Sequence, residues 1–345
     1  MNANEKPVIL LDPSPRKTEI IFSVEDKARL EQLGRVLWHD GPARATNEHI
    51  EQHLADAEAL IGQTPMPAER LARAPRLRAI FNVEGNFLPN VDYAECYRRN
   101  IHVLSCAPAF APAVAEMSLG LAIALARGIV SGDRAFRENA EVYGGASNLD
   151  TITLHGSTFG LIGCGNVGRA QLPLLRPFGG RVLAYDPWIH DHVLEEIGVI
   201  PVKLDALLRQ ARIVFIIAAT TSENQHALGA GELAMLARGS AVILVGRAGV
   251  VEFDALLDAA DCGHLRVGID VFPEEPVPST ARARQTRNTI LSAHRAGGLP
   301  DAYREIGKKV VDDLELILRG LPPQRMQRAI SEITYRIRSK PIAER

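Results

Sequence analysis

Short apolar runs alternate with amphipathic stretches along most of the chain. In the first 110 residues, stretches such as Val24–Leu33 and 47–55 repeat apolar positions at helical spacing. Between them lie five runs with the length and apolar character of buried strands: PVILL, GRVLW, EALIG, LRAIFNV and IHVL. This alternation is typical of an α/β unit built on a parallel sheet.

A second series of the same kind begins at Thr158. Six further runs predict strands: TFGLIG, RVLAY, ARIVFIIAA, SAVILV, LRVGID and NTILSA. Helical patterns between them include Leu204–Gln210, 232–237 and 253–259. The pattern predicts a second doubly wound parallel sheet, of six strands.

Three segments connect or follow these series. A helix is expected from Pro112 to Arg127, and the polar stretch 131–148 after it reads as irregular. A helix over 301–318 has the length to return the chain to the first unit. The final residues, from Leu321, are basic and punctuated by proline, and we expect a partly ordered tail.

Composition limits the classes of partner. The 345 residues, enough for about two domains, are 46% hydrophobic and carry a net charge of −2. This balance favours neither nucleic acid nor a membrane surface, and the apolar run 117–126 is too short to span a bilayer. No signal peptide opens the sequence, and the four cysteines follow no disulfide spacing, so we expect a cytoplasmic protein with reduced thiols.

A glycine-rich motif carries the first specific chemistry. GLIGCGNVGRA contains G-x-G-x-x-G between a predicted strand and a predicted helix, the context in which a dinucleotide pyrophosphate binds. The candidate cofactor-binding residues of this turn are Gly163, Gly165, Asn166, Val167 and Gly168. Cys164 lies inside the turn, as a small filler residue or, alternatively, as a redox switch that blocks cofactor entry.

Asp186 ends the next predicted strand, about 20 residues after the glycines. A carboxylate at this point suits a free ribose hydroxyl and repels a 2′-phosphate, so it favours NAD over NADP. The neighbouring Arg181 carries a positive charge that favours a 2′-phosphate, so NADP stays the alternative cofactor.

Three residues with catalytic chemistry follow the last predicted strands. Arg247, Glu275 and His294 come after SAVILVG, LRVGID and NTILSA respectively. Because the carboxyl ends of parallel strands share one edge, these side chains are expected to meet there. A histidine moves protons near neutral pH, a glutamate orients its ring, and an arginine grips a carboxylate.

Together these motifs resemble the D-specific 2-hydroxy acid dehydrogenases. The resemblance covers nearly the whole chain and includes NVDY, AVAEMSLGLAIALAR, GLIGCGNVGRA, YDP, TSENQHALG, RAGVV, DVFPEEP and AHRAGG in this order. It implies that Arg247 binds and activates the substrate carboxylate, that His294 is the acid/base and that Glu275 is its partner. It further implies that Asp270 contacts the nicotinamide amide and that the loop Glu84, Gly85, Asn86 holds the substrate.

The resemblance also implies an α/β architecture of two doubly wound domains. A flavodoxin-like substrate domain, residues 1–110 and 297–345, would carry a Rossmann NAD-binding domain, residues 111–296, as an insertion. The expected activity interconverts a small D-2-hydroxy acid and its 2-keto acid, in a homodimer formed through the cofactor domain with the helix Pro112–Arg127 as the candidate contact. No metal site is expected, since the sequence around His49 and His53 does not match a zinc-binding motif.

Several positions depart from the family pattern. Leu244-Val245-Gly246 precedes Arg247 where the family has Asn-Thr-Ala, Ala293 replaces a proline, and Ile217-Ala218-Ala219 stands where His-x-Pro is common. Glu84 is unusual in a loop that binds an acid, because its carboxylate would repel the substrate unless it points outward or binds a substrate hydroxyl. Binding of a hydroxyl would indicate a polyhydroxylated acid as the substrate. The alternative function is a non-catalytic NAD(H)-sensing protein on the same scaffold, like the corepressors of this architecture.

Overall fold

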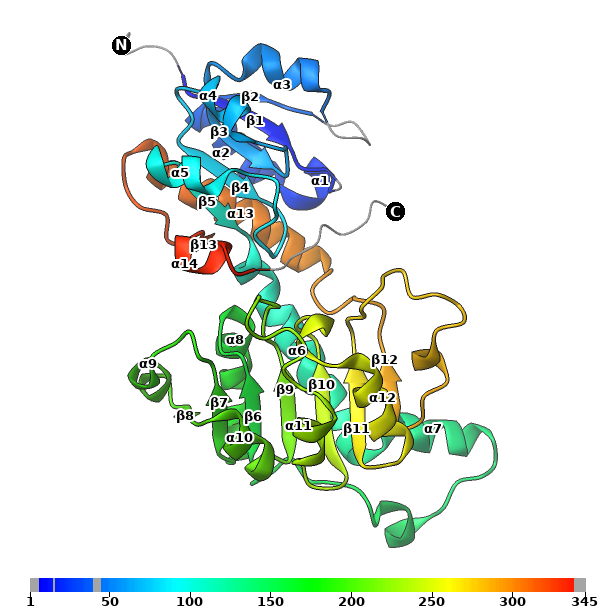
Figure 1. Ribbon diagram of the computed structural model, residues 1–345. Helices are drawn as coiled ribbons and strands as arrows, with labels where there is room; N and C mark the ends of the chain where they lie inside the picture. Colours follow the sequence, from blue (N-terminus) through cyan, green and yellow to red (C-terminus); the bar gives the residue numbers. More distant parts are fainter. Residues whose placement is uncertain (1–5, 15, 40–44, 338–345) are drawn as a thin grey trace. The chain divides into compact units, whose positions relative to one another are not determined.

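The computed structural model describes residues 6–14, 16–39 and 45–337 (Figure 1). The chain divides into two compact units: Met1–Phe110 with Gly298–Arg345, hereafter unit 1, and Ala111–Gly297, hereafter unit 2. Both are α/β units built on a mainly parallel sheet, so the expected fold class is confirmed. The chain passes from unit 1 to unit 2 inside one long helix and returns at Gly297–Gly298.

Unit 1 holds a six-stranded sheet in the order β13-β5-β4-β3-β1-β2. Its parallel strands are β1 (Val8–Asp12), β2 (Arg35–Leu37), β3 (Ala57–Gly62), β4 (Ala79–Asn82) and β5 (His102–Ser105). Its helices are α1 (Thr18–Ile21), α2 (Val24–Leu33), α3 (Asn47–His53), α4 (Ala68–Ala72), α5 (Tyr93–Arg98), α13 (Pro300–Leu318) and α14 (Ser331–Thr334).

Alternation along the strands of unit 1 fills two cores. Ile9 and Leu11 of β1 pack in one core with residues of α1, α2 and α13, whereas Leu10 packs in the other with residues of α3, α4 and α5. A strand with apolar side chains on both faces belongs in a sheet covered on both sides, as parallel sheets generally are.

Within the described residues, the segment after Leu321 takes part in the fold of unit 1, while the rest of the expected tail, residues 338–345, lies outside the described residues. β13 (Gln327–Arg328) pairs antiparallel with β5, and Met326 is buried in the core. The buried Asp313 carboxylate of α13 accepts the N–H groups of Gln324, Arg325 and Met326 at 2.7–3.1 Å. A short segment held by bonds to a distant residue shows no periodic pattern of apolar residues, so the sequence alone did not predict its order.

Unit 2 holds a seven-stranded parallel sheet in the order β12-β11-β10-β9-β6-β7-β8. The strands are β6 (Phe159–Ile162), β7 (Val182–Tyr185), β8 (Ile200–Pro201), β9 (Ile213–Ile216), β10 (Ser240–Leu244), β11 (Leu265–Ile269) and β12 (Thr289–Leu291). The prediction of six strands missed β8, because two residues at a sheet edge carry no alternation.

Helices cover both faces of this sheet (Figure 1). One core contains residues of α10 (Leu204–Gln210), α11 (Ala230–Ala234) and α12 (Phe253–Asp261). The other contains residues of α6 (Ala107–Arg127), α8 (Asn166–Leu175) and α9 (Asp191–Glu196). Unit 2 also contains four short 3₁₀ helices among its described residues: η1 (Gly144–Asn148), η2 (Arg176–Phe178), η3 (Ala248–Val250) and η4 (Arg282–Arg284).

The helix expected from Pro112 begins earlier, at Ala107. Pro108 lies in its first turn, where a missing N–H costs nothing, and Pro112 follows one turn later. With 21 residues, α6 is long and apolar enough to cross a membrane by length and composition, although half of its most apolar window is buried in the protein. It is therefore longer than the apolar run 117–126 indicated.

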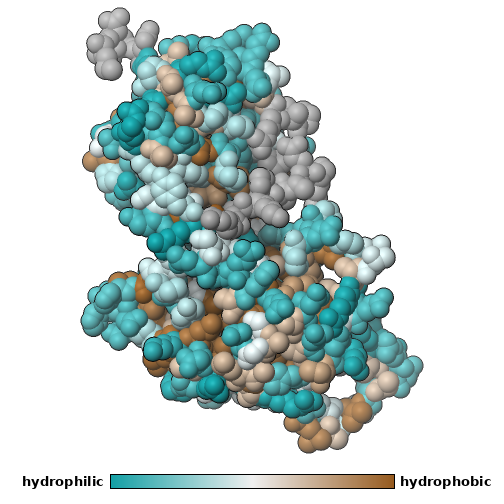
Figure 2. All heavy atoms as spheres, viewed as in Figure 1, coloured by the Kyte–Doolittle hydropathy of each residue, from teal (hydrophilic) through white to brown (hydrophobic). Residues whose placement is uncertain are grey.

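The stretch read as irregular contains a further helix, α7 (Ile129–Arg137). None of its residues is buried, and Ile129, Val130 and Phe136 are exposed. Val142, Tyr143 and Leu149 after it are exposed as well. Hydrophobic surface is visible over this lower part of unit 2 in Figure 2.

Candidate active site

The glycine turn joins β6 to α8 with three distinct geometries. Gly163 has a φ of +92°, and a Cβ on it would lie 2.8 Å from the backbone of Ala218. A Cβ on Gly168 would lie 3.1 Å from the carbonyl oxygen of Gly163, so the helix packs closely on the turn. A Cβ on Gly165 would have no atom within 4 Å, so the backbone here faces open space at the start of α8. A helix N-terminus with open access fits an anionic pyrophosphate.

Asp186 follows β7 and is held by two backbone N–H groups. Its Oδ2 accepts from Cys164 at 2.7 Å, and its Oδ1 accepts from Trp188 at 3.0 Å. The carboxylate therefore lies beside the glycine turn, as a ribose-binding acid should. The Cys164 side chain is buried, and burial together with Asp186 raises the pKa of its thiol to about 11. A protonated, buried thiol fits a filler residue better than a redox switch.

Arg247 directly follows Gly246 after β10. A Cβ on Gly246 would lie 2.7 Å from the Ala218 carbonyl oxygen, so the loop after β10 packs against the loop after β9. The Arg247 Nη1 donates to the Gly246 carbonyl oxygen at 2.7 Å. Since Gly163 also packs on Ala218, this residue joins the glycine turn to the Arg247 loop.

His294 and Glu275 form a close pair. The Nδ1 of His294 lies 2.6 Å from Oε2 of Glu275, and the side chains are 32% and 28% exposed. Oε1 of Glu275 accepts from the backbone N–H of Phe272 at 2.9 Å. Burial acts to raise the pKa of Glu275, but the bonds from His294 and Phe272 and the charge of Arg247 outweigh it, so the pKa lies below its usual 4.5.

An ionised Glu275 is only an acceptor, so it fixes the proton of a neutral His294 on Nδ1. The other ring nitrogen, Nε2, then carries the lone pair that can take a proton from a hydroxyl group. The positive charge of Arg247 contributes to this lowering of the Glu275 pKa, so Arg247 lies within electrostatic range of the His294–Glu275 pair in unit 2.

The backbone of His294 is held in an unusual conformation. Its φ is +50°, and its N–H donates to the carbonyl oxygen of Asp270 at 2.8 Å. The Asp270 carboxylate accepts the N–H groups of Arg295 and Ala296 at 3.0 and 3.1 Å, and Asp270 is only 1% exposed. Asp270 thus shapes the loop that carries His294, a role that the sequence did not indicate.

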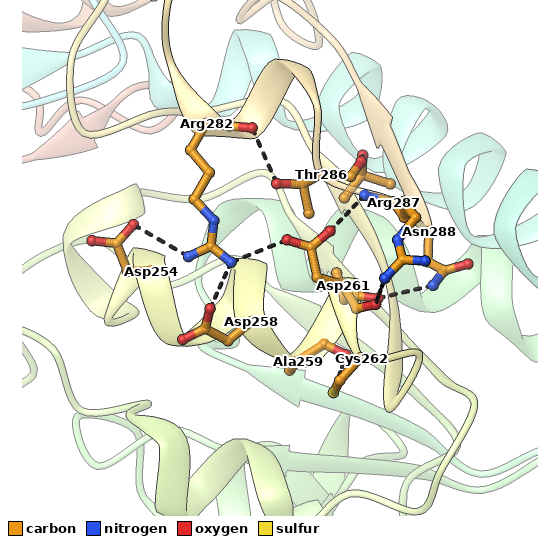
Figure 3. A network of polar contacts seen from close by, with 11 residues as sticks. Asp254, Asp258, Ala259, Asp261, Cys262, Arg282, Thr286, Arg287 and Asn288 are labelled. Carbon is orange, nitrogen blue, oxygen red and sulfur yellow. Dashed lines mark hydrogen bonds and ion pairs between the residues drawn. The ribbon is translucent and has the colours of Figure 1, made fainter.

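The segment carrying Glu275 is tied to α12 by a polar network (Figure 3). Arg282 reaches Asp258 at 2.6 Å and Asp261 at 3.0 Å, and Asp261 also accepts the N–H of Arg287 at 2.9 Å. Arg284 donates to the carbonyl oxygens of Val277 and Pro278, both at 2.8 Å. These contacts hold the segment between Glu275 and β12 against α12.

The substrate loop predicted in unit 1, Glu84 to Asn86, follows β4. The buried amide of Gln63, with its oxygen facing the loop, accepts from the N–H groups of Val83 and Glu84 at 3.1 Å each. In the described residues no protein acceptor takes the N–H of Gly85 or Asn86. These two groups, rather than that of Glu84, are therefore the better candidates for holding a carboxylate.

Glu84 does not point outward: the residue is 8% exposed. Its partner is Arg16, whose Nη2 lies 2.9 Å from Oε1 and 3.0 Å from Oε2. Burial acts to lower the pKa of Arg16, but the Glu84 carboxylate, Tyr303 and Cys106 together outweigh it, so the pKa is raised and the guanidinium stays charged. Sequence reasoning missed Arg16, because it follows β1, 68 residues before its partner.

His49 and His53, whose spacing does not match a zinc-binding motif, lie near each other. The ring centroids of His49 and His53 are 5.4 Å apart, edge to face. Across the described part of the chain, no group of three or more metal-ligating side chains lies close enough to hold an ion.

The model of one known family matches most of unit 2. Residues 119–296 match the model of the D-isomer specific 2-hydroxyacid dehydrogenase, NAD binding domain. A glyoxylate reductase from Korarchaeum cryptofilum is 28% identical over 302 residues, which cover 86% of this chain and 90% of the relative. A D-3-phosphoglycerate dehydrogenase from Methanocaldococcus jannaschii is 26% identical over 84% of this chain but only 55% of its own length. The chain thus spans about half of that relative.

Among solved structures, a phosphoglycerate oxidoreductase from Rhizobium etli is similar over both units. It is 41% identical, with a TM-score of 0.84 over 95% of this chain and 100% of the other. A D-mandelate dehydrogenase from Rhodotorula graminis, 19% identical with a TM-score of 0.76 over 93% of this chain and 97% of the other, shares the fold.

Proposed function

Because the chain belongs to the D-isomer specific 2-hydroxyacid dehydrogenase family, we propose that it is an NAD-dependent enzyme that interconverts a small D-2-hydroxy acid and its 2-keto acid. The family assignment itself makes it an NAD(P)-binding oxidoreductase. The observation that carries the proposal is the 2.6 Å contact between His294 and Glu275, with Arg247 close by.

Proton transfer is assigned to His294. In the oxidation direction its Nε2 takes the proton of the substrate hydroxyl, and Glu275 stabilises the positive charge that forms on the ring. Arg247 binds the substrate carboxylate and polarises the reacting oxygen. In reduction, His294 returns the proton to the oxygen of the keto group. The nicotinamide cofactor, when bound, accepts or supplies the hydride.

The cofactor site is assigned to the turn that Gly163, Gly165, Asn166, Val167 and Gly168 form in unit 2. The open backbone at Gly165 fits the pyrophosphate, and Asp186 at the end of β7 fits an unphosphorylated ribose. Asp270 stays a proposed neighbour of the nicotinamide amide: each of its carboxylate oxygens accepts one backbone bond and keeps capacity for another.

Glu84, Gly85 and Asn86 are assigned to the substrate, with the N–H groups of Gly85 and Asn86 holding a carboxylate. Relatives include a glyoxylate reductase and a phosphoglycerate oxidoreductase, whose names differ in whether the substrate carries a phosphate. The proposed substrates include acids that carry further hydroxyl groups.

A homodimer formed through unit 2 and a cytoplasmic location complete the proposal. The exposed apolar side chains of α7 and residues 142–149 support a protein contact next to α6, the helix named from the sequence. The four cysteines, all free, are compatible with a reducing compartment.

The proposal is tested by mixing the protein with NADH or NADPH and a panel of 2-keto acids, including glyoxylate, pyruvate and hydroxypyruvate. We expect oxidation of the reduced cofactor with at least one acid, and kcat/KM at least about tenfold higher with NADH than with NADPH. Cofactor binding without turnover on the whole panel would instead favour the NAD(H)-sensing alternative. A preference for NADPH would contradict the assignment of Asp186.

A further inference from the structure

Unit 1 contains a buried ion pair next to the proposed substrate loop. Arg16 follows β1 and Glu84 follows β4, so both lie at the carboxyl edge of the sheet, where α/β units bind ligands. The side chains are 15% and 11% exposed. Desolvating a pair this deeply buried is costly, and the loss of one partner strongly destabilises the folded protein, because the remaining charge is then buried without compensation.

The contacts of Arg16 connect the pair to the loop itself. Its Nε donates to the carbonyl oxygen of Val83 at 3.1 Å, directly before Glu84. The guanidinium carbon lies 4.7 Å from the ring centroid of Tyr303 and 5.4 Å from that of Phe110. A Cβ on Gly85 would lie 3.3 Å from the Phe110 ring, so this ring packs on the loop as well.

The charge of this cluster is balanced. Arg16 contributes one positive charge and Glu84 one negative charge, with Arg16 Nη2 within 3.0 Å of both carboxylate oxygens. A balanced pair offers an approaching anion little net attraction, whereas a lone arginine in the same place would attract it strongly. The loop can still hold one carboxylate through the N–H groups of Gly85 and Asn86.

We propose that the Arg16–Glu84 pair determines substrate specificity, because Glu84 neutralises the charge of Arg16 and the enzyme therefore prefers 2-keto acids with an uncharged substituent to those with a second anionic group. This inference rests on the proposed function, and it narrows the substrate class to acids whose remaining groups are hydrogen, alkyl or hydroxyl. It sets the preferred substrate apart from a phosphorylated acid.

The test compares hydroxypyruvate with 3-phosphohydroxypyruvate, which differ only in the phosphate group. The selectivity is the ratio of kcat/KM for the phosphorylated acid to kcat/KM for hydroxypyruvate, with NADH as cofactor. In the wild type we expect a ratio below one. In Glu84→Gln, which frees the charge of Arg16, the ratio should rise by at least about tenfold.

Two further variants keep the test decisive if Glu84→Gln fails to fold. Arg16→Gln leaves Glu84 as an unbalanced anion, and the ratio should fall. The double variant Arg16→Gln/Glu84→Gln removes both charges, and its ratio should lie within about twofold of the wild-type value. Thermal unfolding and NADH affinity are measured for each variant, because a merely structural role would lower stability without shifting the ratio in opposite directions.

Different results would contradict different parts of the account. A wild-type preference for the phosphorylated acid, or the same ratio in all folded variants, would overturn the inference and leave the proposed function intact. Absence of turnover with both acids and with the wider panel would overturn the proposed function, and the inference with it.

Discussion

The sequence was sufficient to identify His294 as a candidate site residue, but it was not sufficient to predict how His294 is held. Its place after the last predicted strand, behind Arg247 and Glu275, was enough to nominate it as the acid/base from the sequence. The sequence does not reveal that Nδ1 is the nitrogen facing Glu275, nor that the backbone has a φ of +50°. That conformation is uncommon outside glycine and depends on Asp270, whose bonds to residues 294–296 are set by the tertiary structure.

The role of Glu275 as the partner of His294 is tested by Glu275→Gln. An amide keeps the size of the side chain but stabilises a charged imidazole less, so we expect kcat to fall by about tenfold or more. NADH affinity should change little, since Glu275 is not among the proposed cofactor ligands. Steady-state kinetics and NADH fluorescence titration measure the two effects, and an unchanged kcat would remove Glu275 from the mechanism.

The same variant also has a pH signature in stability. The pKa of Glu275 is lower in the folded protein than its usual 4.5, so the unfolded chain binds more protons in that range. The stabilisation by Glu275 is therefore complete above about pH 4.5 and is lost as pH falls through the lowered pKa. The difference in unfolding temperature between the wild type and Glu275→Gln should narrow with falling pH over that window.

At the scale of elements, periodic segments were predictable and short or exposed ones were not. α10 has the predicted bounds, Leu204–Gln210, because its apolar residues repeat at helical spacing within a clear strand–helix–strand series. β8 has two residues, and α7 buries none of its apolar side chains, so neither produces the pattern of a core element. The glycine turn was predictable because its residue types are demanded by backbone geometry.

The turn allows cofactor binding to be separated from folding. Gly165→Ala adds a methyl group in open space, so we expect an unfolding temperature close to wild type and NADH affinity weakened by about tenfold or more. Gly163→Ala combines a positive φ with a 2.8 Å clash and should lower the unfolding temperature by more than about 4 °C.

Gly231→Ala is the matched control for the turn, since its Cβ also meets nothing within 4 Å and it lies in α11. It should alter neither property. Equal NADH affinity in Gly165→Ala and Gly231→Ala would contradict the placement of the pyrophosphate at the turn.

At the scale of the whole molecule, the order of strands, helices and motifs was sufficient to predict two α/β sheets and a dinucleotide-binding oxidoreductase. Features that depend on contacts between distant segments were not accessible. The Arg16–Glu84 pair joins residues 68 positions apart, and the Asp313 side-chain carboxylate holds the segment after α13 by accepting its backbone N–H groups. Substrate preference depends on such contacts, so it is the part of the function least visible in the sequence.

The central claim is that His294 transfers the proton during reduction and oxidation of the substrate. Its most direct test is the kcat of His294→Ala on the best 2-keto acid of the panel, with His192→Ala, a histidine whose side chain is 81% exposed, as the control. The account predicts a fall in kcat of about 10²- to 10⁴-fold with NADH affinity preserved, and no change in the control. A His294→Ala enzyme with the kcat of the wild type would contradict it.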